Sequence, residues 1–204
     1  MSQAHPLTRR LAVALVTPAL LAGSTVALLA QQPSFPNTRK LGRAAVQYQD
    51  DDLKAVAAYY HSQRQHDAPW ILIETAVTTR SDRIVITRED VSLVAPDGTS
   101  LALPPQSRFR EDFQTTRLLV RNASAVSHGV GTYFSDRPIV ESINFFTLPG
   151  GDIIQNEFAV DSDRVVIGDL FFESPTGRWD AGTYTLVIAH PGTGARAALP
   201  IELE

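Results

Sequence analysis

The stretch RWDAGTYTLVI, residues 178–188, carries the clearest structural signal in the chain. From Thr183 onward it is rich in β-branched and apolar residues, and a Pro-Gly turn signal follows at 191–192. A short run of this composition that ends at such a turn predicts a β-strand over 183–190. A β-strand needs neighbouring strands to pair with, and the sequence predicts several more.

Short runs of the same kind recur through the C-terminal part of the chain. Residues 91–95 and 100–103 flank a Pro-Asp-Gly turn at 96–98, where proline presets φ and glycine supplies a positive φ, so they predict a β-hairpin. The other runs that predict strands are 70–79, 83–88, 139–148, 163–172 and 197–203. About eight or nine short strands separated by turns are typical of an antiparallel β-sandwich.

Within the opening stretch, Asp180, Gly182 and Tyr184 have the spacing of the pattern D-x-G-x-Y-x-C, with Leu186 in the cysteine position. The pattern resembles the penultimate strand of immunoglobulin domains. The resemblance implies an all-β fold, an immunoglobulin-like antiparallel β-sandwich over residues 70–204, in which the Tyr184 hydroxyl bonds to the preceding loop. Leu186 would fill the core in place of a disulfide: a disulfide typically contributes about 2–4 kcal/mol and a buried leucine about 1.5–3 kcal/mol. This fold serves many functions, so the resemblance predicts no activity.

Three segments lack the strand pattern. Residues 31–49 contain two prolines and no periodicity, which predicts a linker. Residues 50–66 begin with three aspartates and continue with apolar residues at i, i+3, i+4 and i+7, which predicts a short amphipathic helix before the sandwich. Residues 107–125 combine phenylalanine and leucine with many charges and predict a helical insertion. The apolar residues with helical spacing in 50–66 are Leu53, Val56, Ala57 and Tyr60.

The N-terminal residues 1–30 predict export or membrane attachment. Residues 11–30 are uncharged and follow two arginines. A transmembrane helix needs about 20 apolar residues, so this segment can be a retained anchor in the bilayer; it can also be a signal peptide that is cleaved after Ala30. We favour an anchor in a bacterial inner membrane with the domain on the periplasmic side, and a secreted or soluble periplasmic protein is the alternative. The basic residues predicted to rest on lipid headgroups next to the anchor are Arg39, Lys40 and Arg43.

Composition and motifs argue against several classes of function. The net charge of −4 disfavours nucleic acid as a partner, because phosphates require a basic surface. The chain has no cysteine, which excludes disulfides and zinc–cysteine sites. It also lacks a nucleophile elbow, a P-loop and histidines at ligand spacing. We therefore expect no catalytic residues, cofactor or metal, and a hydrolytic enzyme is the least favoured function.

Two aromatic pairs, Phe145-Phe146 and Phe171-Phe172, lie in predicted strands. Successive strand residues point to opposite faces, so one member of each pair should point away from the core unless the helical insertion covers it. We take Phe146 and Phe172 as a candidate protein interface.

The favoured function is therefore a non-enzymatic, membrane-anchored extracytoplasmic interaction module. Its natural role would be an accessory or tethering subunit of a larger membrane protein complex, whether secretory, respiratory or photosynthetic. Its partners would be the other protein subunits of that complex. The alternative is a soluble exported domain that binds a sugar or a peptide.

Overall fold

The computed structural model describes residues 34–64, 68–80, 82–151 and 153–204. The chain divides into two compact units, Met1–Ser34 and Phe35–Glu204, and the second unit contains the strands and helices described below. The predicted anchor or signal peptide in residues 1–30 lies outside the described residues. Within the ranges that are described, no helix combines the length and the apolar character needed to span a bilayer.

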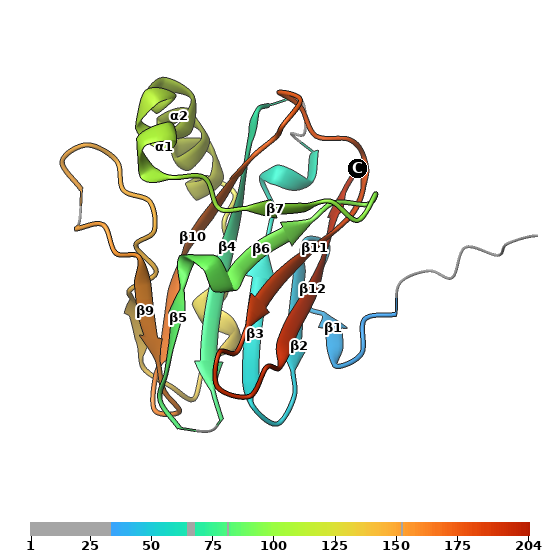
Figure 1. Ribbon diagram of the computed structural model, residues 1–204, viewed down its shortest axis with the longest axis vertical. Coiled ribbons are helices and arrows are strands. Elements are labelled where there is room, and N and C mark those ends of the chain that lie inside the picture. Colours follow the sequence, from blue (N-terminus) through green and yellow to red (C-terminus); the bar gives the residue numbers. More distant parts are fainter. Residues whose placement is uncertain (1–33, 65–67, 81, 152) are drawn as a thin grey trace, which may run out of the picture. The chain divides into compact units, whose positions relative to one another are not determined.

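A six-stranded sheet with the order β1-β2-β3-β4-β10-β8 organises the second unit (Figure 1). Its neighbours pair antiparallel except for β10 and β8, which are parallel. The strand β4 lies inside this sheet because its sequence, WILIETAVTT, is apolar or β-branched on both faces and is buried almost throughout. The strands are β1 (Thr38–Lys40), β2 (Ala45–Gln49), β3 (Leu53–Ala58), β4 (Trp70–Thr79), β10 (Val165–Glu173) and β8 (Ile139–Glu141).

A four-stranded sheet with the order β12-β11-β6-β7 packs against the first, with β12 in contact with β2 and β3. The predicted hairpin around 96–98 is confirmed, because β6 and β7 pair antiparallel across it. A separate two-stranded sheet joins β5 and β9. These strands are β12 (Arg196–Leu203), β11 (Gly182–Ala189), β6 (Val91–Val94), β7 (Ser100–Ala102), β5 (Ile84–Thr87) and β9 (Glu157–Val160).

The predominance of β-structure confirms the predicted class at that level. The predicted immunoglobulin-like sandwich goes further than this arrangement supports. The described residues form several sheets, and one pair of strands, β8 with β10, is parallel. The immunoglobulin-like sandwich is built from two antiparallel sheets, so the finer fold assignment is not confirmed.

The predicted linker over 31–49 and the predicted helix over 50–66 are wrong for the described residues, which form β1, β2 and β3 followed by the 3-10 helix η1 (Ser62–Arg64). The helical spacing of apolar residues was misleading because β3 pairs with a strand on each side and is buried on both faces. Pairing of this kind overrides local propensity. The aspartates do not begin a helix: the Asp50 carboxylate accepts hydrogen bonds from the backbone N–H groups of Asp52 (2.9 Å) and Leu53 (2.7 Å) and so shapes the turn between β2 and β3.

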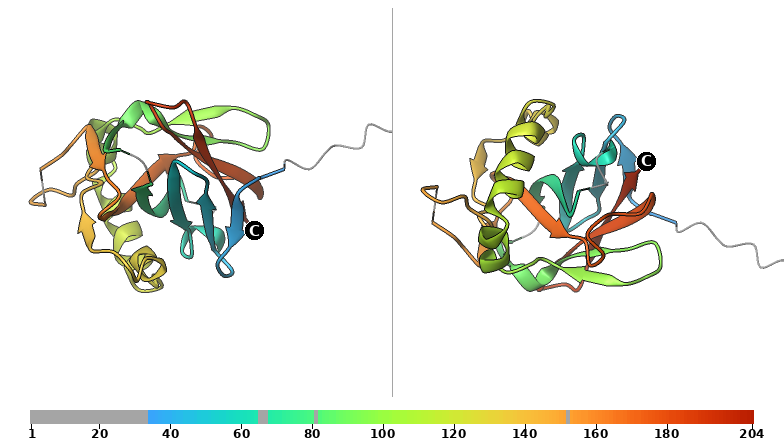
Figure 2. Two further views of the ribbon diagram at one scale, coloured as in Figure 1. Left: turned by 90° about the horizontal axis from the view of Figure 1, so that it is seen from below. Right: turned by 90° about the horizontal axis from the view of Figure 1, so that it is seen from above.

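The predicted helical insertion is confirmed as α1 (Gln106–Glu111) and α2 (Phe113–Ser124). Helix α2 packs against β4, and the 3-10 helix η3 (Val130–Tyr133) that follows packs against β3, β4 and β10. Figure 2 shows α1 and α2 on one side of the six-stranded sheet and β11 with β12 on the other. The central strands β4 and β10 therefore have one face in the core between the sheets and the other face under the helices. The remaining 3-10 helix, η2, spans Arg88–Asp90.

Candidate functional site

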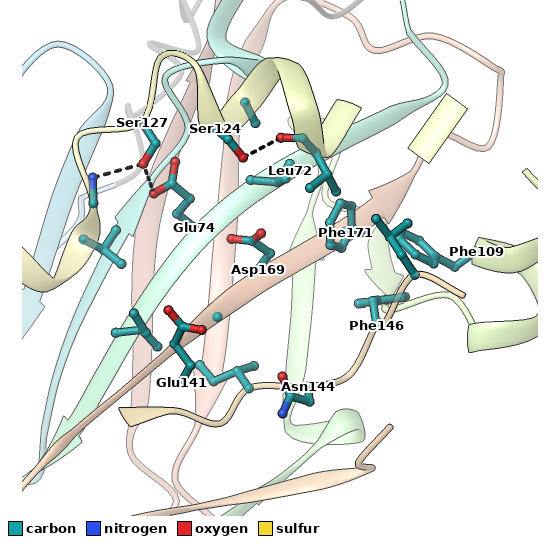
Figure 3. Close-up of a pocket in the computed structure, with 18 residues that line it drawn as sticks. Leu72, Glu74, Phe109, Ser124, Ser127, Glu141, Asn144, Phe146, Asp169 and Phe171 are labelled. Atoms are coloured by element: carbon teal, nitrogen blue, oxygen red, sulfur yellow. Dashed lines mark hydrogen bonds between the residues drawn. The ribbon is translucent and has the colours of Figure 1, made fainter. Parts of the chain in front are cut away.

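A cleft with a volume of about 530 Å³ lies between the helix-facing side of β4 and β10, helix α2, and the segment 141–148 (Figure 3). Pockets that bind small molecules usually enclose about 300–1,000 Å³, so the cleft is large enough for a ligand. Its two ends differ in chemistry. Aromatic rings gather at one end and carboxylates at the other, as the labelled side chains in Figure 3 show. The aromatic end is defined by Phe109, Phe146 and Phe171. The acidic end is defined by Glu74, Glu141 and Asp169.

The register between β4 and β10 explains why acidic and aromatic side chains lie at opposite ends of the cleft. Glu74 lies directly opposite Asp169, and Leu72 lies directly opposite Phe171. Side chains alternate between the faces of a strand, so these two pairs project from the same face, one after the other. Glu141 ends β8, which runs beside β10, and it completes the acidic end.

The carboxyl group of Asp169 lies in an unfavourable environment. Burial, followed by the charges of Glu74 and Glu141, raises the pKa of Asp169 to about 7. Within the described part of the chain, its side chain forms no hydrogen bond or ion pair with another residue. Like charges directly opposite one another destabilise a sheet, so this pair is not explained by the stability of the fold. Ionisable groups with perturbed pKa values in a cleft are candidates for function.

The carboxylate of Glu74, unlike that of Asp169, has a hydrogen-bond donor and a basic neighbour. Burial raises its pKa, while a hydrogen bond from the Ser127 hydroxyl (2.5 Å) and the charge of His128 act in the opposite direction. The Ser127 oxygen also accepts a hydrogen bond from the backbone N–H of Gly129 (3.0 Å). The segment after α2 thus holds Ser127 over Glu74 and fixes the position of this carboxylate in the cleft.

The wall opposite α2 is held against β10 at Gly168. A Cβ atom at this position would lie 2.5 Å from the backbone oxygen of Ile143, which is closer than real Cβ atoms approach. The backbone N–H groups of Ser142 and Ile143 both donate to the carbonyl oxygen of Ile167 (3.2 and 3.1 Å). A residue without a side chain is therefore required where segment 141–148 crosses β10 and encloses the cleft.

The charge of the lining can attract a cation. Its described residues include three acids and no lysine or arginine. In the same described ranges, no three Asp, Glu or His side chains are grouped so that they could hold a metal ion. The Ser127 hydroxyl donates to Glu74, and no hydrogen bond joins it to the neighbouring His128 among the described contacts. Carboxylates in a cleft of this kind can accept charge-assisted hydrogen bonds from an ammonium or guanidinium group.

The predicted aromatic interface is wrong, because Phe146 is 8% exposed and Phe172 is fully buried. Phe172 lies opposite Ile71 and points into the core between the sheets, whereas Phe171 points toward the helices. The ring of Phe109 in α1 packs on Phe171 (4.8 Å between centroids) and on Phe146 (5.2 Å). The helical insertion covers these rings, and Phe145-Phe146 lie in the irregular segment after β8 rather than in a strand.

The two structural residues predicted in the opening stretch have the contacts expected of them. The Tyr184 hydroxyl donates to the backbone oxygen of Asp180 (3.2 Å), four residues earlier. Leu186 is fully buried in β11, within the main core. The ring of Trp179 packs edge-on against Tyr184, with 5.4 Å between centroids.

The predicted membrane-surface residues lie at the outer edge of the six-stranded sheet, in β1 and the turn after it. All three are exposed. Lys40 forms an ion pair with Glu202 (2.7 Å), and Arg43 donates to the side-chain oxygen of Gln63 (2.9 Å). Contact of Arg39, Lys40 and Arg43 with lipid stays a prediction.

The acidic residues of the cleft were not recognised as a site from the sequence. A signal was present, because Glu74 interrupts the apolar run WILIETAVTT and Asp169 interrupts VVIGDLFF. A charged residue in a strand that is otherwise apolar on both faces is unusual in a protein interior. Their register, which places them opposite each other, could not be read from either run alone.

Comparison with known proteins gives little additional information. No protein-family model matches the sequence. No curated protein matches it either. Among solved structures, the chain is similar to the crystal structure of a "putative lipoprotein" from Bacillus subtilis, with a TM-score of 0.38 and 15% sequence identity over 76% of this chain. The match spans 38% of that structure's chain, and a similarity this weak supports no conclusion about fold or function.

Proposed function

We propose that the protein is a non-enzymatic extracytoplasmic binding module whose ligand enters the cleft between β4, β10 and α2. The observation that carries the proposal is the cleft itself. It is of ligand size, it has an aromatic end and an acidic end, and it contains an unpaired carboxyl group at Asp169. A ligand would compensate for this unfavourable group, and no residue of the described chain does so.

We therefore favour a ligand cleft over an aromatic protein interface as the mode of action. The interface predicted from the sequence depended on Phe146 and Phe172, and both are buried. The alternative of an exported binding domain needs a concave site with both apolar and polar groups, which the cleft supplies. A role as an accessory subunit of a membrane complex, with other subunits as partners, stays a separate prediction.

The proposal that the module is not an enzyme has support from the groups that line the cleft. Nucleophilic catalysis needs a hydroxyl or thiol in contact with a base that is itself oriented. The Ser127 hydroxyl donates to the carboxylate of Glu74. The Ser127 oxygen also accepts a hydrogen bond from the backbone N–H of Gly129, which holds this side chain in the wall of the cleft.

Attachment to a bacterial inner membrane, with the module on the periplasmic side, is proposed from the sequence of residues 1–30. The apolar run of 11–30 has the length of a bilayer span. Exposed Arg39, Lys40 and Arg43 follow it in the chain and would suit anionic headgroups.

The test is to isolate the full chain from its own cells in a mild neutral detergent and to examine it by native mass spectrometry for a bound small molecule. The variant Ser124→Trp places a large ring at the exposed rim of the cleft, and Ala125→Trp is the matched control because Ala125 is exposed but does not line the cleft. We expect a bound molecule on the wild type and on the control, and none on Ser124→Trp. Equal occupancy of all three proteins would contradict the proposal.

A further inference from the structure

We propose that the ligand of the cleft is an organic cation, a primary amine or guanidinium that carries an apolar group. This inference rests on the proposed binding function and names the chemistry of the ligand. It follows from the separation of the cleft into two ends, which a ligand must match simultaneously.

The aromatic end suits an apolar group, because its three rings are 1% to 8% exposed and carry no polar atoms. Phe109, Phe146 and Phe171 form a cluster of mutually packed rings, with centroid distances of 4.8, 5.2 and 5.3 Å. All three also line the cleft, as do Leu148 and Val120. An apolar group that enters here loses its contact with water and gains contact with the rings.

The acidic end requires a positive charge. Each element around it contributes either an acid or an uncharged side chain: β4 contributes Glu74, β10 contributes Asp169 and β8 contributes Glu141. Helix α2 contributes Val120, Ala123 and Ser124, which do not titrate. Among the described residues, His128 is the basic group whose charge acts on Glu74. An anion would be repelled here, and a neutral ligand would leave the opposed acids without compensation.

The shape of the site favours an organic cation over a metal ion. The acids lie on one wall of a cleft that extends to the aromatic rings, and the described residues contain no cluster of three ligands for a metal. An ammonium or guanidinium group needs no closed shell of ligands. It can donate to Glu74 and Asp169 from the side while the attached chain runs toward Phe171.

Binding of a cation should depend on pH. Burial raises the pKa of Glu74. Burial and neighbouring acids raise the pKa of Asp169 to about 7, so a proton on Asp169 competes with the ligand in the neutral range. A ligand that requires the ionised form of a group with this pKa binds on the order of 100-fold more weakly at pH 5 than at pH 8.

The experiment is calorimetric titration of the full chain, in a mild neutral detergent, with three probes that share one skeleton: phenylbutylamine, phenylbutanol and phenylbutanoate. Titrations into empty detergent micelles correct for partitioning. The double variant Glu74→Gln with Asp169→Asn keeps the shape of the cleft and removes two charges, and Asp51→Asn, an exposed aspartate in the turn before β3, is the control. We expect the amine to bind at least 10-fold more tightly than the alcohol, and this preference to disappear in the double variant alone.

A second arm separates the sources of the cation. The acetylated dipeptide amide Phe-Lys is compared with Phe-Gln, and preference for Phe-Lys over both Phe-Gln and phenylbutylamine would identify a basic peptide rather than a free amine as the ligand. Equal binding of amine and alcohol, or an amine affinity that the double variant leaves unchanged, would overturn the inference. If the alcohol binds and Ser124→Trp blocks it, the proposed function holds and only the assignment of charge fails. If no probe binds, the inference fails, and the native mass spectrum decides the proposed function.

Discussion

Replacement of Asp169 by asparagine should stabilise the protein at neutral and alkaline pH. Asparagine has the same shape but no charge. The pKa of Asp169 is raised from 3.8 to about 7, about three units, and each unit corresponds to about 1.36 kcal/mol, so the ionised carboxylate costs the fold at most about 4 kcal/mol. The carboxyl group is only partly buried beside an open cleft, and water there reduces the cost. We expect a gain on the order of 2–4 kcal/mol at pH 8.

The sign of the pH dependence follows from proton binding. Between about pH 4 and pH 7 the folded protein holds a proton on Asp169 that the unfolded chain has released, so the contribution of Asp169 to stability falls as the pH rises through this window. Below about pH 4 both states are protonated, and the variant should gain almost nothing. Above about pH 7 Asp169 is ionised in both states, and its unfavourable contribution to stability no longer changes with pH.

Urea unfolding of the wild type, Asp169→Asn and the control Asp51→Asn, at intervals from pH 4 to pH 8, measures this difference. The curves for the wild type and Asp169→Asn should converge at pH 4 and separate with rising pH, whereas Asp51→Asn should follow the wild type. A gain at pH 8 that persists unchanged at pH 4 would show that charge is not its cause. A variant less stable than the wild type at pH 8 would show that the Asp169 carboxylate has a stabilising partner and that its ionisation does not destabilise the fold.

Five further outcomes are expected. Leu186→Ala should lower the free energy of unfolding by about 2–5 kcal/mol because it empties a fully buried site, and Tyr184→Phe by about 1 kcal/mol because it removes one hydrogen bond; denaturant titration compares them. Phe172→Ala should cost about 3–5 kcal/mol in the same assay, since this ring lies in the core, and a neutral result would restore it as an interface residue. Gly168→Ala should cost about 1–3 kcal/mol and weaken ligand binding, because its Cβ would displace the backbone of the opposing wall; unaltered calorimetric binding would contradict this. The full chain should stay with membranes through high salt and an alkaline carbonate wash, as apolar insertion is not screened by ions, and its release by either wash would favour cleavage of the N-terminal segment.

Strands could be predicted wherever the sequence carried both a β-rich run and a turn. The hairpin of β6 and β7 and the strand β11 were located in this way, because proline and glycine mark their ends. The prediction failed at β3, where LKAVAA fits a helix and a strand equally well. What decides between them is that β2 and β4 are available as partners, and that is a property of the whole fold.

The candidate site was harder to predict than the fold, because it depends on register. Glu74 and Asp169 are 95 positions apart in the chain and become neighbours only through the pairing of β4 with β10. The same pairing directs Phe171 toward the helices and Phe172 toward the core. A shift of one residue would exchange these faces, so no inspection of the separate strands could have identified the cleft.

The central claim is that the cleft of β4, β10 and α2 is a ligand site. The most direct measurement is a solution NMR titration of the isotope-labelled full chain with phenylbutylamine at pH 8, which follows each backbone amide. We expect saturable shifts that concentrate at Ser127, Gly129, Gly168 and Asp169, and that vanish in Ser124→Trp but persist in Ala125→Trp. Shifts that concentrate on other surfaces, or that survive in Ser124→Trp, would contradict it.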